Sequence, residues 1–188
     1  EHRLKTDGAS SGRQHAWSHV RVRIRRTREV GQRHAEWRSP AGCKLLALAQ
    51  RPALQEVRKA LAPELNSWRQ TPRPATRCLS LLARRRRYDL AVQVLAAMRR
   101  EHVHCDTLHY NAAISACEKS REWQLALRLL REMLALRLDP DTVSYNAAVS
   151  ACEKAAQWRL ALSLPEQMPR TGVAPNLVSY SAAISACE

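Results

Sequence analysis

The sequence predicts an all-α protein, a right-handed solenoid of helix–turn–helix repeats with a period of 35 residues. One phrase predicts it: YNAAISACEK begins at Tyr110 and returns as YNAAVSACEK at Tyr145 and as YSAAISACE at Tyr180, a step of 35 residues each time. Self-similarity at a fixed period of about 20 to 50 residues is typical of solenoids. Their units bury apolar faces by stacking on neighbours.

The spacing of apolar residues within one copy predicts two helices, because one helical face recurs at i, i+3, i+4 and i+7. The polar letters EKSRE between the two faces predict a turn. The prolines of RLDPD and GVAPN are expected to end the second helices. The first face consists of Tyr110, Ala113, Ile114 and Cys117, and the second of Trp123, Leu127, Leu130 and Leu134.

The period divides the chain into a repeat array and a leading part. The array is expected over 72–188, with a degenerate copy at 72–106, full copies at 107–141 and 142–176, and a truncated copy at 177–188. Residues 43–71 have helical spacing without a clear phase match, so they are interpreted as a capping helix pair or an eroded repeat. Residues 1–42 are expected to be a basic, disordered segment.

The charge of the chain predicts a polyanionic partner. The sequence has 31 Lys and Arg against 17 Asp and Glu, a formal net charge of +14. Such an excess favours nucleic acid or an acidic surface. The segment VRVRIRRTREV in residues 1–42 is interpreted as a nucleic-acid-binding arm, an edge strand or part of an organelle presequence. No apolar run approaches the roughly 20 residues of a membrane span, so no membrane partner is expected.

The positions of the cysteines and histidines favour a role in helix packing over disulfides or metal binding. Cys117, Cys152 and Cys187 recur once per copy. Packed helices lie about 8–10 Å apart whereas a disulfide needs Cα atoms within about 7 Å, so buried free thiols in a reducing compartment are expected. The segment HVHCDTLH, with His102, His104, Cys105 and His109, matches no familiar zinc spacing. No metal, cofactor, small-molecule substrate or catalytic activity is predicted.

Further landmarks of each copy are a Tyr-Asn opening, a Trp or Tyr before the letters xLAL, a Met near the end of the second helix, and a terminal Pro-Asp or Pro-Asn. With the 35-residue period, this pattern resembles the pentatricopeptide repeat (PPR) family over 72–188, most closely over 107–188, and the chain is expected to be a fragment. The alternative is a tetratricopeptide-type scaffold for protein–protein interaction, although the Trp, Leu-Gly, Tyr pattern of that family is absent.

The resemblance implies sequence-selective binding of single-stranded RNA, one base per repeat. It implies a role in organellar RNA processing, stability, editing or translation, in a mitochondrion or chloroplast, with other RNA-processing proteins as further partners. The residue after the Tyr and the last residue of the repeat would read the base as G, U and C or U in order. These pairs are Thr76 with Asp106, Asn111 with Asp141, and Asn146 with Asn176, followed by Ser181 alone.

Other roles follow from the same resemblance. Leu108, Val143 and Val178 would stack against bases. Lys119 and Lys154, each at the end of a first helix, would bind phosphate or only interact with the helix C-terminus.

Two features depart from a plain repeat. The run Arg84–Arg87 is interpreted as a solvated turn or a non-specific phosphate contact. Pro165 stands where Leu130 stands one period earlier and is followed by Pro169, so the second helix of that copy is expected to be shortened or broken.

Overall fold

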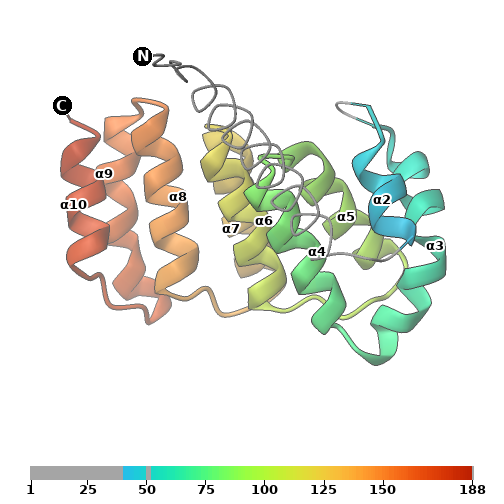
Figure 1. The fold of residues 1–188 in the computed structure, drawn as a ribbon. Coiled ribbons are helices and arrows are strands. Elements are labelled where there is room, and N and C mark those ends of the chain that lie inside the picture. Colours follow the sequence, from blue (N-terminus) through green and yellow to red (C-terminus); the bar gives the residue numbers. More distant parts are fainter. Residues whose placement is uncertain (1–39, 50–51, 188) are drawn as a thin grey trace, which may run out of the picture. The chain divides into compact units, whose positions relative to one another are not determined.

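The structure is a computed structural model that describes residues 40–49 and 52–187 (Figure 1). The basic segment expected at 1–42 lies outside these residues except for 40–42, which begin a helix. Within the described residues every regular element is helical, which confirms the all-α class. None of the helices in this part of the chain is both long enough and apolar enough to cross a membrane.

The helices alternate with short turns along the described chain. They are α2 (Pro40–Leu46), α3 (Leu54–Gln70), α4 (Arg73–Arg84), α5 (Tyr88–Arg100), α6 (Thr107–Lys119), α7 (Trp123–Ala135), α8 (Thr142–Lys154), α9 (Trp158–Gln167), the 3₁₀ helix η1 (Met168–Thr171) and α10 (Leu177–Ser185).

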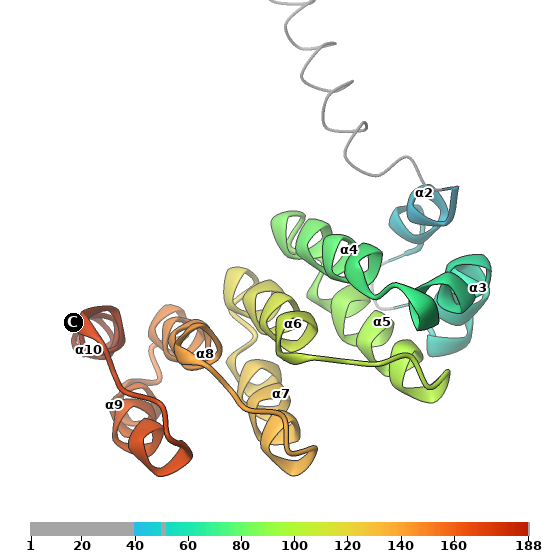
Figure 2. The ribbon, with the colours of Figure 1, turned by 90° about the horizontal axis from the view of Figure 1, so that it is seen from below.

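The helices of the array form two rows (Figure 2). The first helices α4, α6, α8 and α10 pack side by side in series. The second helices α5, α7 and α9 each pack between two members of that row, so α7 contacts both α6 and α8. This arrangement confirms the predicted solenoid of helical hairpins.

The hairpin α2–α3 precedes the array and differs from it. Helix α3 packs against α2 and against α5, next to the row of second helices (Figure 2). It has 17 residues against 13 in α5, and only Thr71 and Pro72 separate it from α4. The usual loop between successive hairpins is therefore absent between α3 and α4.

The turns repeat as regularly as the helices. A left-handed residue follows each of α4, α5, α6, α7, α8 and η1, and the next N–H bonds back to a carbonyl five residues earlier, as from Glu122 N to Cys117 O at 3.0 Å. This is the Schellman cap, which usually employs Gly. Here the left-handed residues are Arg86, Arg121 and Ala156 after the first helices, and His102, Arg137 and Gly172 after the second helices.

Small and aromatic residues of the repeated phrase form the core. Tyr110 and Tyr145 are buried between helices, as are two alanines of each phrase, Ala113 and Ala116 in the first and Ala148 and Ala151 in the second. Cys117 and Cys152 are buried free thiols, as predicted, and burial raises their pKa to about 12 and about 11. Cys187 is also free but exposed, which corrects the prediction that it is buried.

The second helix of this copy is shortened, as predicted: α9 contains Pro165 and ends at Gln167, two residues before Pro169. Helix α9 has 10 residues, whereas α5 and α7 have 13 each. A proline has no N–H to donate and its ring clashes with the preceding turn. The chain continues as the 3₁₀ helix η1, so α10 still begins one full period after α8.

Candidate nucleic-acid interface

A closed network of polar groups joins α6 to the start of α8. The amide nitrogen of Asn111 lies 3.1 Å and 3.2 Å from the two carboxylate oxygens of Asp141. The hydroxyl of Ser144 donates to the amide oxygen of Asn111. Asp141 is also the N-cap of α8 and accepts from the backbone N–H of Ser144 at 2.8 Å. Two of the predicted residues, Asn111 and Asp141, are therefore brought together and held in one orientation.

The same network recurs one period later between α8 and α10. The amide nitrogen of Asn146 lies 3.3 Å from Oδ1 of Asn176. Ser179 donates its hydroxyl to the amide oxygen of Asn146 at 2.6 Å. Asn176 caps α10 by accepting from the backbone N–H of Ser179 at 3.0 Å. The shortened helix α9 has thus left the predicted Asn146–Asn176 pair intact.

The local sequence explains why these pairs form. A helix needs a side-chain acceptor at its N-cap, and Asp and Asn are preferred there. The third helical residue accepts a hydrogen bond from the cap backbone. Ser144 Oγ accepts from Asp141 N–H at 3.2 Å, and Ser179 Oγ accepts from Asn176 N–H at 3.2 Å. Sequence reasoning missed both serines. The recurring capping pattern, Asp or Asn followed three residues later by Ser, would have found them.

The two networks differ in what they offer to a ligand. Burial opposes ionisation of Asp141. Hydrogen bonds from the Ser144 backbone and side chain, from Asn111 and from the Val143 backbone outweigh burial and hold the pKa of Asp141 below its ordinary value of 3.8. At neutral pH this carboxylate can only accept hydrogen bonds. Asn176 is exposed, and its amide nitrogen has no partner among the described residues, so it remains a donor.

The first unit is built differently. Asp106 caps α6 by accepting from His109 N at 3.0 Å, but the imidazole of His109 occupies the place of the serine. Its Nε2 lies 3.2 Å from the hydroxyl of Thr76, and its Nδ1 lies 2.6 Å from Oδ1 of Asp106. Within the described residues no hydrogen bond joins Thr76 to Asp106, so the structure does not bring this predicted pair together directly.

The last unit holds Ser181 alone. Its hydroxyl donates to the carbonyl of Val178 at 3.2 Å within α10, and the side chain is exposed. It therefore has no capping partner comparable with Asp141 within the described chain.

Apolar side chains lie exposed beside the Asn-centred networks. Leu108 and Val143 are each 60% exposed and Val178 is 56% exposed, although large apolar residues are usually buried. Each stands three residues before the residue that follows the Tyr, hence on the same face of its helix. Asn111 itself is 9% exposed, and Asn146 is more accessible. In α4 the equivalent of Leu108 is Arg73, which is also exposed.

The two predicted phosphate-binding lysines lie in different surroundings. Lys154 forms an ion pair with Glu118 of the preceding first helix, and Glu118 also accepts from the hydroxyl of Ser150 at 3.3 Å. The residue one period before Glu118 is Ala83, so Lys119 has no equivalent partner. No ion pair of Lys119 occurs within the residues that the structure describes.

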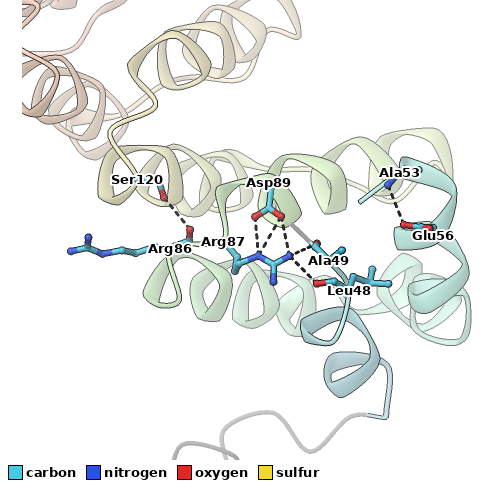
Figure 3. Close-up of polar contacts among 8 residues, drawn as sticks. All are labelled: Leu48, Ala49, Ala53, Glu56, Arg86, Arg87, Asp89 and Ser120. Carbon is cyan, nitrogen blue, oxygen red and sulfur yellow. Dashed lines mark hydrogen bonds and ion pairs between the residues drawn. The ribbon is translucent and has the colours of Figure 1, made fainter. Parts of the chain in front are cut away.

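Part of the arginine run at the end of α4 and the start of α5 makes contacts within the fold (Figure 3). Arg87 binds the carboxylate of Asp89 at 2.9 Å and the carbonyl of Ala49 at 2.9 Å, which ties α5 to the end of α2. The carbonyl of Arg86 accepts from Ser120 at 3.1 Å, while its side chain is exposed. Arg85 is exposed as well. A phosphate contact from this turn is thus expected of Arg85 and Arg86 rather than Arg87.

Comparison with known proteins gives the following matches. The PPR repeat family matches residues 105–154 and 140–188, and the pentatricopeptide repeat domain matches residues 76–120, which together cover more than half of the chain. No curated protein matches the chain closely enough in sequence to count as a relative.

The chain is similar to solved structures of the pentatricopeptide repeat protein PPR10 from maize. The PPR10 crystal structure matches with 27% identity and a TM-score of 0.54, over 73% of this chain and 22% of that chain. PPR10 in complex with an 18-nt psaJ RNA element matches with 27% identity and a TM-score of 0.54, over 77% and 23%. This chain therefore spans less than a quarter of the length of the structures it matches.

Proposed function

The chain belongs to the pentatricopeptide repeat family, and we propose that its row of first helices binds single-stranded RNA and reads one base with each repeat. The observation that carries the proposal is the recurring network of Asn111, Asp141 and Ser144, which returns at Asn146, Asn176 and Ser179. Family membership and the complex of PPR10 with an RNA element support it.

The two networks leave hydrogen-bonding capacity for a base. An amide nitrogen carries two hydrogens and an amide oxygen has two lone pairs. Since each network uses the amide nitrogen toward the cap and the oxygen toward the serine, each Asn keeps both a donor and an acceptor. A rigid side chain with a fixed orientation distinguishes base edges better than a freely rotating one, because mismatched polar groups are left unpaired.

The second residue of each pair, Asp141 or Asn176, explains why the two units are expected to prefer different bases. Uracil presents an N3–H donor, which suits the acceptor-only carboxylate of Asp141, directly or through water. Cytosine presents N3 as an acceptor and suits a donor such as the free amide nitrogen of Asn176. Asn176 also keeps an oxygen that can accept from uracil. We therefore assign uracil to the Asn111 unit and either pyrimidine to the Asn146 unit.

The exposed apolar residues serve as stacking surfaces in this proposal. Leu108, Val143 and Val178 stand at equivalent positions on successive first helices, so a base at each reading site meets an apolar side chain. Burial of the base face offsets the cost of exposing these residues to water in the free protein. Lys119 supplies a phosphate contact.

The cellular setting is proposed from family membership. We place the chain in a mitochondrion or chloroplast, where the bound RNA would be protected or presented to processing factors. No catalytic step is assigned to this chain. Fractionation of the source cells with immunodetection tests the setting, and recovery outside both organelles would refute it.

Binding to oligoribonucleotides tests the central proposal. A U-rich and an A-rich oligoribonucleotide of equal length are compared at about 50 and 200 mM salt, because phosphate contacts weaken with salt while base contacts persist. The proposal predicts that the U-rich oligonucleotide is preferred at both salt concentrations. Equal binding that disappears at the higher concentration would leave only a generic basic surface, and no RNA binding at all would favour a protein-binding scaffold.

Asn111→Thr tests the role of a single side chain. It should move the preference of that unit from U toward G. Asn66→Thr, at an exposed residue of α3, is the matched control and should change nothing. If U remains preferred in the Asn111 variant, Asn111 does not read a base.

A further inference from the structure

His109 gives the first reading unit a chemistry that its Thr76–Asp106 pair alone does not predict. The residue is 0% exposed and lies where the other two units have Ser144 and Ser179. In those units the capping residue contacts the Asn directly. In the first unit the imidazole ring stands between the hydroxyl of Thr76 and the carboxylate of Asp106.

The partners of the ring fix the direction of its hydrogen bonds. Nε2 lies 3.3 Å from the carbonyl oxygen of Pro72, which can only accept, and 3.2 Å from Oγ1 of Thr76. Nε2 therefore carries a hydrogen, and the hydroxyl oxygen of Thr76 faces a donor. The hydrogen of that hydroxyl then points away from the ring and is available to a base.

The other side of the ring engages Asp106. Nδ1 accepts from the backbone N–H of Asp106 at 3.2 Å, which agrees with a hydrogen on Nε2, and it lies 2.6 Å from Oδ1 of Asp106. Oδ1 accepts from the backbone N–H of His109 at 3.0 Å. This carboxylate is thus held at the cap of α6, on the Nδ1 side of the ring, while Thr76 lies on the Nε2 side. It cannot orient Thr76 as Asp141 orients Asn111.

We infer that His109 is a positioning residue that sets the base preference of the Thr76 unit, an inference that rests on the proposed function. By holding Thr76 as a lone donor, His109 makes the unit accept any purine. Guanine offers O6 and adenine offers N1 to a hydroxyl donor. Only a nearby carboxylate that accepts from guanine N1–H would distinguish them, and His109 keeps Asp106 from that position.

Five oligoribonucleotides in an adenine background test this inference by equilibrium binding. Four have the cores AUC, CUC, GUC and UUC, and the fifth, with the core GAC, reports the preference for U at the middle position. Wild type should bind the AUC and GUC cores within about threefold of each other. His109→Ser restores the side chain found in the other units and should prefer GUC over AUC by about tenfold, the discrimination typical of one good base contact. His109→Gln can still reach Thr76 with an amide donor and should behave like wild type.

The outcomes separate this inference from the proposed function. A tenfold GUC preference in wild type, or an unchanged ratio in His109→Ser while U is still preferred at the middle position, overturns the inference alone. Loss of any preference for U at the middle position in wild type overturns the proposed function and the inference with it. If His109→Ser does not fold by circular dichroism, Thr76→Val decides: an equal loss for AUC and GUC supports the inference, and a loss confined to GUC overturns it.

Discussion

Replacing Asp141 by Ala should destabilise the array by about 2–4 kcal/mol. The substitution removes two contributions. One is the N-cap of α8, worth about 0.5–2 kcal/mol. The other is the acceptor of Asn111, whose amide nitrogen would be left unsatisfied at a side chain only 9% exposed, at a cost of about 1–3 kcal/mol. The two groups share one network, so their effects are not fully additive.

Asp141→Asn separates the cap from the charge. Asn caps helices as well as Asp does, and Asn176 shows that its oxygen accepts from the preceding Asn at 3.3 Å. This variant should therefore lose less than about 1 kcal/mol. Asp139→Ala is the matched control in the same loop, because Asp139 is exposed and only its backbone carbonyl accepts a hydrogen bond, from Thr107. It should change stability by less than about 0.5 kcal/mol.

Urea unfolding followed by circular dichroism measures all three variants. The sign of the pH effect is an additional check. The folded pKa of Asp141 is lowered, so its charge contributes stability above its ordinary pKa of 3.8, and this contribution is lost as the pH falls below that value. The difference between wild type and Asp141→Asn should shrink in that range. An Asp141→Ala variant as stable as Asp139→Ala would refute the reasoning.

Three further predictions follow from the turns, the charges and the thiols. Ala156→Gly should raise the free energy of unfolding in urea by about 0.5–1 kcal/mol, because Ala156 has φ 55°, and a loss of stability would contradict the cap geometry. Lys119→Ala should lower the salt slope of RNA binding by about 0.7, and Lys154→Ala by less because Glu118 already neutralises it; equal slopes would contradict this. Iodoacetamide should label exposed Cys187 before buried Cys117, whose pKa is raised to about 12, as followed by mass spectrometry; the reverse order would contradict the packing.

The fold was predictable because the repeated phrase shows both the 35-residue period and the spacing of apolar residues that is typical of helices. The pairing of Asn111 with Asp141 was predictable from the family resemblance alone. Its physical cause, that Asp141 is also the cap of the next helix, is seen only in the packed structure.

The first unit could not be predicted from its pair of residues. Thr76 and Asp106 are separated by the same number of residues as Asn111 and Asp141. A third side chain, His109, lies between Thr76 and Asp106, so they do not form the direct contact that Asn111 and Asp141 form. The exposure of Cys187 was missed for a related reason. Periodicity assigns equal positions to equal residues, whereas burial depends on the neighbours that each helix has.

Exchanging the second residues of two neighbouring units tests most directly whether the networks read bases. The double variant Asp141→Asn with Asn176→Asp keeps both caps and both Asn residues, so its fold should be retained. Binding to oligoribonucleotides that vary at the two corresponding positions should show the preferences exchanged, with either pyrimidine at the Asn111 unit and uracil at the Asn146 unit. Unchanged preferences in a folded double variant would contradict the account.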